Sequence, residues 1–165
     1  MSLNISPHNF HQLSGDLEKK LHMIAEHILC DQSKVGSVVN LKFMTTQEMI
    51  LLNQEFRKKN SDTNVLSFPI NIDIEQLSDE LGDIAISVPF VKTESHSLNR
   101  DLDDHMMHLL AHGILHLLGF DHEQENDANI MEAKEINYLE FFKIANSYLI
   151  CPTKTLIKPS PRRVF

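Results

Sequence analysis

The sequence predicts an α+β fold: a single domain in which helices surround a small central mixed β-sheet. The chain has 165 residues, 42% of them hydrophobic, which is enough for one well-formed core and too few for two ordinary domains. Short β-branched segments alternate with longer segments of helical periodicity, and no internal repeat is present. One of the helical segments ends in a cluster of histidines.

The first half of the chain contains two predicted helices and a strand. Apolar residues recur at helical spacing from Asp16 to Cys30, which predicts the first helix. Val38 to Met44 alternates in the manner of a strand. Thr45 or Thr46 can cap a second helix that continues to Phe56.

The second half contains two predicted strands and two predicted helices. Val65 to Phe68 and Asp83 to Val88 are short β-branched segments bounded by proline or glycine, so we expect strands. The acidic segment Ile70 to Leu81 is predicted to be a loop. Leu102 to Leu118 and Asn126 to Tyr148 have the length and apolar spacing of helices.

The predicted domain covers residues 1–150. Cys151 to Phe165 contains three prolines and no apolar periodicity, so we expect a flexible tail. No segment is apolar for long enough to span a bilayer, and no basic region followed by an apolar run opens the chain. The two cysteines are far apart and predict no disulfide, which is typical of the cytoplasm.

Three histidines lie at the end of the helix predicted over Leu102 to Leu118. His112 and His116 are four residues apart and therefore project from the same helix face, about 6 Å apart along the axis. Gly119 stands where the helix should end, because glycine adopts the left-handed conformation at little cost. The chain can then turn back and deliver His122 to the other two rings.

This spacing predicts a site for one zinc ion with three nitrogen ligands and a fourth position for water. Catalytic zinc commonly has three protein ligands, whereas structural zinc commonly has four and often uses cysteine. His105 and His108 continue the same helical stripe upstream. We interpret them as residues that support the ligands or the core, with His108 as the alternative ligand.

The order of ligands matches the His-x-x-x-His-x-x-Gly-x-x-His pattern of metzincin proteases. Those enzymes have a glutamate, the general base, directly after the first histidine. Here that position is Gly113. The metal site therefore resembles theirs, but peptide hydrolysis would need a base from elsewhere, so a metalloprotease is the less favoured interpretation.

Several segments together resemble the YbeY family of single-domain endoribonucleases. The signature is the segment HGILHLLGFDH, His112 to His122. Leu52 to Lys59 and Thr63 to Pro69 resemble the family's other motif block, and Leu81 to Ser87 is a weaker match between the two blocks. The resemblance spans about residues 40–145. The family usually has aspartate at the position of Asn64 and tyrosine at that of Phe120.

The resemblance implies a metal-dependent, single-strand-specific endoribonuclease that acts in ribosomal RNA maturation, including 16S rRNA 3′-end processing, and in ribosome quality control. It implies one zinc per chain, held by His112, His116 and His122. It implies catalytic functions for Arg57, His112 and His116. Expected partners are ribosomal RNA, the small ribosomal subunit and ribosomal or ribosome-associated proteins, with no membrane.

The net charge of the chain is unfavourable for RNA binding, but one short segment is basic. The net charge is −8, whereas most affinity for phosphates comes from lysine and arginine. Arg57, Lys58 and Lys59 form a short basic segment, which charge alone would explain as the positive end of a helix. The family resemblance instead favours an interaction of Arg57 with the reacting phosphate.

The proton acceptor and the attacking group, water or the RNA's own 2′-OH, are not identified by the sequence. The carboxylates to consider are Asp83, Asp121 and Glu123. We expect Asp121 rather to accept a hydrogen bond from a ligand histidine. The alternatives to a ribonuclease are a metzincin-like metalloprotease and a non-catalytic ribosome assembly factor with a structural metal.

Overall fold

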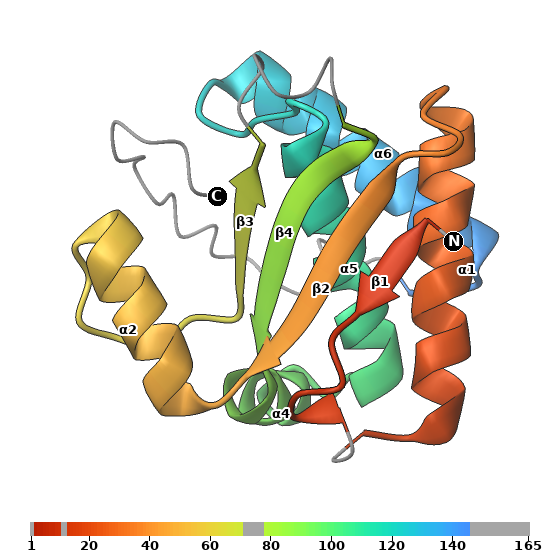
Figure 1. Cartoon of the computed structure of the whole chain (residues 1–165). Helices are drawn as coiled ribbons and strands as arrows, with labels where there is room; N and C mark the ends of the chain where they lie inside the picture. Colours follow the sequence, from red (N-terminus) through yellow and green to blue (C-terminus); the bar gives the residue numbers. More distant parts are fainter. Residues whose placement is uncertain (1, 11–12, 71–77, 146–165) are drawn as a thin grey trace.

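The computed structural model describes residues 2–10, 13–70 and 78–145, which form a four-stranded sheet with helices on both faces (Figure 1). The elements are, in order, β1 (Leu3–Ile5), α1 (Gly15–Asp31), β2 (Val38–Met44), α2 (Thr46–Arg57), β3 (Val65–Pro69), β4 (Glu80–Ser87), α4 (Val88–Ser97), α5 (Leu102–Leu117) and α6 (Glu125–Phe141). This architecture confirms the predicted α+β class.

The sheet is mixed, with the strand order β1-β2-β4-β3. β1 is parallel to β2 and β2 is parallel to β4, while β3 is antiparallel to β4, with Val65 opposite Ile86. β3 is therefore an edge strand of the sheet formed by the described residues. Its position matters because helices α5 and α2 flank it from opposite faces.

The two faces of the sheet bury separate clusters of apolar side chains. Ile84 and Ile86 belong to the large cluster that includes the buried residues of α1 and α5. Ala85, which points the other way because side chains alternate along a strand, packs with Leu66 and Met49 of α2. Figure 1 shows α5 behind the sheet and α2 beyond the edge strand.

Most elements lie where the sequence predicts them. β2 has the predicted bounds, and α1, α5 and α6 lie within about two residues of their predicted starts. Thr45 is the cap of α2: its Oγ1 accepts from the Glu48 amide, and the Glu48 carboxylate accepts from the Thr45 amide. The two bonds form the reciprocal capping box of a helix N-terminus.

Some predicted bounds were wrong, and two elements were not predicted. β4 begins at Glu80 and thus includes residues assigned to the loop, while Val88 opens α4 because Pro89 fits the first turn of a helix, where no amide donor is needed. β1 is too short to show a period. α6 ends at Phe141, not at residue 148.

The remaining predictions for residues 71–77 and for the tail from Cys151 to Phe165 lie outside the described residues. In the part of the chain that the structure describes, no helix has the length and hydrophobicity needed to cross a membrane.

Candidate metal centre

Helix α5 brings two of the three predicted ligands together on one face. His112 and His116 are one turn apart, and their ring centroids lie 4.5 Å from each other. The helix packs beneath the sheet, with Ile114 and Leu115 fully buried. This packing fixes the helix against the core, so that the two rings project from a rigid support.

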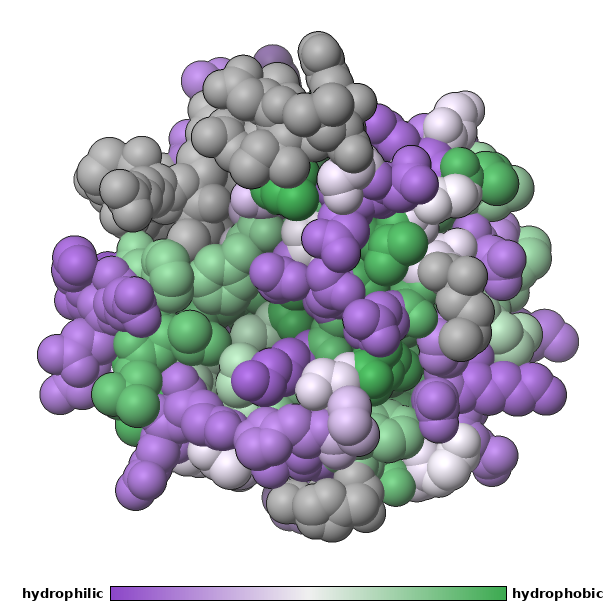
Figure 2. Space-filling view, viewed as in Figure 1, coloured by the Kyte–Doolittle hydropathy of each residue, from purple (hydrophilic) through white to green (hydrophobic). Residues whose placement is uncertain are grey.

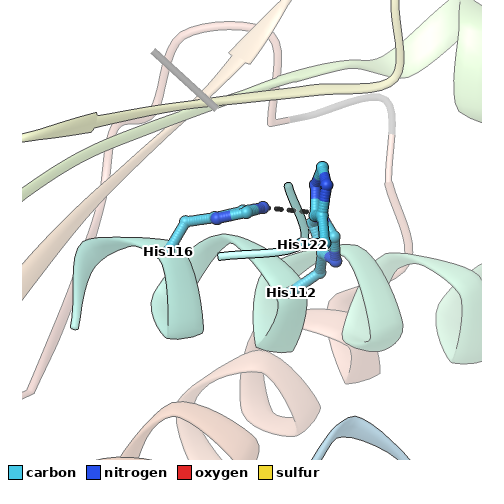
Figure 3. Close-up of side chains that lie close together, drawn as sticks. All are labelled: His112, His116 and His122. Carbon is cyan, nitrogen blue, oxygen red and sulfur yellow. Dashed lines mark hydrogen bonds between the residues drawn. The ribbon is translucent and has the colours of Figure 1, made fainter. Parts of the chain in front are cut away.

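A turn at Gly119 delivers the third histidine. Gly119 has a φ of +93°, its amide donates to the His116 carbonyl, and the amide of Phe120 donates to the Leu115 carbonyl. This is the Schellman arrangement at a helix C-terminus. The chain reverses there, and the His122 ring lies 4.8 Å from that of His116 and 5.6 Å from that of His112 (Figure 3).

Two acceptors outside the triad determine which ring nitrogens carry a hydrogen. The Nδ1 of His112 lies 2.5 Å from Oε1 of Glu135, and the Nδ1 of His116 lies 3.0 Å from the carbonyl oxygen of Phe120. A carbonyl or an ionised carboxylate can only accept, so both Nδ1 atoms must donate. The Nε2 atom of each neutral ring is left with its lone pair.

The remaining nitrogens are arranged as a metal would require. One ligand atom from each of His112, His116 and His122 lies within 4.8 Å of the others, and the two Nε2 atoms on α5 are 3.0 Å apart. Two lone pairs at this distance repel unless a proton or a cation lies between them. Tetrahedral zinc, with bonds of about 2.0–2.1 Å, would place them about 3.3 Å apart. The donor set therefore fits zinc.

The surroundings of His116 and His122 favour the neutral form of these two rings, which is the form that binds metals. Burial, followed by the neighbouring His112 and His122, lowers the pKa of His116 to about 2. Burial and His112 also lower the pKa of His122. Burial opposes ionisation of Glu135, but the facing His112 and the hydrogen bonds from His108 and His112 outweigh it, so the Glu135 pKa lies below its usual value. Glu135, the acceptor for His112, is thus a buried anion.

The structure explains the glycine where metzincins have their catalytic glutamate. A Cβ atom on Gly113 would lie 2.9 Å from Cδ1 of Ile84 and 3.0 Å from Oγ of Ser67. The Ser67 hydroxyl itself donates to the Gly113 carbonyl. Position 113 therefore faces the sheet and not the triad, and a glutamate there could not act as a base at the site.

The other residues considered from sequence lie around the triad in different positions. His108 is not part of the triad, since its Nε2 bonds to Glu135 instead. His105 is buried and bonds to Glu94. Asp121 accepts from the backbone amides of His122 and Glu123, whereas Phe120 and Glu135 are the acceptors for the ligand rings. Glu123 and Asp83 are exposed.

Arg57 lies on a different element from the triad. It is the last residue of α2, a helix that packs on the face of the sheet opposite α5, and it is partly buried. Burial lowers its pKa, although an arginine stays charged at neutral pH. No hydrogen bond within the described ranges joins it to the histidines. Lys58 and Lys59, next to it, are exposed.

Asn64, where the family usually has aspartate, binds a carboxylate. Its Nδ2 lies 3.2 Å from Oε2 and 3.3 Å from Oε1 of Glu94. An amide can donate to this carboxylate, whereas an aspartate could do so only if one of the two acids were protonated. The asparagine therefore suits the neighbour it has in this chain.

Glu135 is the residue of the site that the sequence analysis missed. It is a fully buried carboxylate on α6, whereas the carboxylates considered from the sequence were Asp83, Asp121 and Glu123. A signal was present, because Glu135 stands on the apolar stripe formed by Met131, Tyr138 and Leu139. A charged residue at a core position of a helix is almost always paired.

Comparisons with known proteins agree with this fold and site. The family described as "Endoribonuclease YbeY" matches residues 5–143. Endoribonuclease YbeY of Francisella tularensis subsp. novicida is 38% identical over 115 residues, covering 67% of this chain and 71% of that protein. The Coxiella burnetii protein of the same name is 36% identical over 134 residues, covering 81% and 87%.

A solved structure is also similar. The solution structure of TM1509 from Thermotoga maritima aligns with a TM-score of 0.57 and 26% identity, covering 84% of this chain and 87% of that one. The fold and the site together define a small α+β protein with a three-histidine candidate metal centre. The chain belongs to the endoribonuclease YbeY family.

Proposed function

We propose that this protein is a zinc-dependent endoribonuclease that cleaves single-stranded RNA during ribosomal RNA maturation. The convergence of three imidazole nitrogens, on a chain of the endoribonuclease YbeY family, is the observation that supports the proposal most strongly. We extend it to 16S rRNA 3′-end processing and ribosome quality control in the cytoplasm, with the small ribosomal subunit and its proteins as partners.

In this proposal His112, His116 and His122 hold one zinc ion per chain. The bound ion would supply Lewis-acid chemistry, lowering the pKa of water and polarising a phosphoryl oxygen. Glu135 and the Phe120 carbonyl hold the rings of His112 and His116 so that their Nε2 atoms point to the ion. The ligands are thereby oriented before any substrate arrives, which is what electrostatic preorganisation requires.

Arg57 is proposed to stabilise the negative charge that develops on the reacting phosphate. Support comes from the resemblance of its segment to the family's motif block. Because α2 and α5 flank the edge strand β3 from opposite faces, an RNA strand contacting both groups would have to pass around this edge.

The surface near this edge contains apolar side chains that bases could contact. Figure 2 shows apolar atoms gathered over α2 and the neighbouring edge of the sheet. Leu51 on α2 is 66% exposed. Phe56, also on α2, and Phe68 on β3 are partly buried, and their rings are 5.0 Å apart. Aromatic and apolar surfaces with nearby cations are typical of sites for single-stranded nucleic acid.

The test is cleavage of a single-stranded ribosomal RNA fragment by zinc-loaded protein. We expect the parent to cleave it and a His116→Ala variant, purified in the same way, to lose activity. His96→Ala is the matched control, because His96 is exposed on α4, away from the triad. Absence of cleavage by a parent that holds one zinc per chain would contradict the proposal and favour a ribosome assembly factor.

The metalloprotease alternative is disfavoured by Gly113. The position that carries the metzincin base packs against Ile84 and Ser67, so the chain cannot place a carboxylate there without disturbing the core. A generic protein substrate, incubated with the same preparation, checks this directly, and we expect no hydrolysis.

A further inference from the structure

A continuous series of hydrogen bonds runs from α4 to the candidate metal centre. Nε2 of His105 lies 2.7 Å from Oε2 of Glu94, and NH1 of Arg100 lies 3.0 Å from Nδ1 of His105. The same NH1 lies 3.2 Å from Nδ1 of His108. The series continues through Glu135, which connects His108 with the predicted ligand.

Arg100 determines which histidine nitrogens in this series accept a hydrogen bond and which donate one. A guanidinium group has only donors, so the Nδ1 atoms of His105 and His108 must both accept. The hydrogen of each neutral ring then lies on Nε2. For His105 that hydrogen points to Glu94, and for His108 it points to Glu135, whose Oε2 is 3.1 Å away. Arg100 thus determines the tautomer of His108.

Glu135 connects the tautomer of His108 to that of His112, the predicted metal ligand. Its Oε2 accepts from His108 and its Oε1 accepts from Nδ1 of His112. The carboxylate is 0% exposed, so both of its oxygens need donors from the protein. With His108 and His112 both donating to Glu135, the His112 ring must turn its Nε2 lone pair toward His116 and His122.

We propose that Arg100, His108 and Glu135 are positioning residues that fix the tautomer of His112 and thereby raise the affinity of the site for zinc. None of the three is a ligand in this arrangement. The inference rests on the proposed use of the triad as a zinc site, but not on RNA cleavage. It predicts a coupling between Arg100 and Glu135, although His108 lies between them.

The substitution Glu135→Gln exposes this coupling because a carboxamide has one acceptor and one donor group. If its oxygen accepts from His112, its NH₂ faces Nε2 of His108, whose hydrogen must then move to Nδ1 and meet the N–H of Arg100. If it turns the other way, its NH₂ faces Nδ1 of His112, and the hydrogen of that ring must move to the atom that should bind zinc. The first orientation brings two donors together, and the second removes the lone pair that should bind zinc.

Replacing Arg100 by methionine removes one of these conflicts, since His108 can then carry its hydrogen on Nδ1. The experiment is a double-mutant cycle on the full chain, with Zn²⁺ affinity measured by competition with a chelating dye. We expect Glu135→Gln to weaken binding by about 10-fold to 100-fold, the usual range for groups that support a ligand. In the Arg100→Met background, we expect Glu135→Gln to weaken it at least about threefold less.

Two further measurements distinguish a positioning role of these residues from an indirect effect on protein stability. Glu140→Gln is the matched control, because it makes the same change at an exposed site on α6, and it should leave zinc affinity unchanged. Side-chain ¹H–¹⁵N spectra of the zinc-loaded parent should show the hydrogen of His108 on Nε2 and that of His112 on Nδ1. These spectra require no variant, so the proposal stays testable if a variant fails to fold.

The opposite tautomer for His108 in the parent would overturn the proposal. So would an unchanged zinc affinity in Glu135→Gln, or equal losses with and without Arg100. A parent that binds zinc with the expected tautomers but cleaves no RNA would contradict the proposed function and leave this inference standing.

Discussion

The Nδ1 atom of His116 donates to the carbonyl oxygen of Phe120, four residues further along the chain, across 3.0 Å. This bond orients the ring, and it exists only because the chain reverses at Gly119 between the two residues. The turn therefore has two effects on the site: it orients the His116 ring, and it brings His122 back to the helix. Its backbone geometry should matter for zinc binding as well as for stability.

Gly119→Ala tests the turn. No atom lies within 4 Å of the position a Cβ would take, but φ is +93°, so the cost is conformational, about 1–2 kcal/mol. We expect that loss in the free energy of unfolding, measured in urea, together with weaker zinc binding. Gly15→Ala, which also meets no atom and has no positive φ, is the control and should be neutral or slightly stabilising.

Gly113→Ala tests the contact between α5 and the sheet. Alanine favours a helix over glycine by about 1 kcal/mol, but its Cβ would approach the side chains of Ile84 and Ser67 to 3.0 Å or less. Overpacking of this kind costs about 1–3 kcal/mol. We expect a net loss of stability and a lower melting temperature. A melting temperature above that of the parent would contradict this prediction and show that Ile84 and Ser67 can move to accommodate the methyl group.

Zinc should stabilise the folded protein through the triad. A ligand that binds only the folded state at about 100 times its dissociation constant adds about 2.7 kcal/mol. We expect zinc to raise the melting temperature, a chelator to reverse the increase, and His122→Ala to abolish it. His96→Ala should retain the increase, and a His122→Ala variant stabilised as strongly as the parent would exclude this histidine as a ligand.

Acid should weaken the capping box of α2. The backbone hydrogen bond from Thr45, with a further bond from His8, lowers the Glu48 pKa from 4.5 to about 2. A depressed folded-state pKa contributes stability above the unfolded value of 4.5, and this contribution disappears as the pH falls toward 2. A carboxyl NMR titration should place the Glu48 midpoint near 2. In Glu48→Gln, unfolding between pH 4.5 and 2 should depend less on pH.

Local patterns in the sequence were sufficient to predict α1, α2, α5, the start of α6, β2 and the convergence of the three histidines. The spacing of His112 and His116 is a property of one helix, and Gly119 encodes the turn to His122 within the same short segment. Such features depend on neighbouring residues, so periodicity and turn chemistry reveal them. The Thr45 cap was predicted for the same reason.

The tertiary structure decided what lies around the triad. Glu135 is 23 residues from His112 along the chain, and Glu94 and Arg100 lie on or just after a helix that the sequence analysis did not predict. Only the packing of α4, α5 and α6 brings these groups into hydrogen-bonding distance. Tertiary packing also placed α2, which ends at Arg57, on the other face of the sheet and turned Gly113 toward Ile84. The sequence did not predict these contacts, because contacts between distant elements leave no period in it.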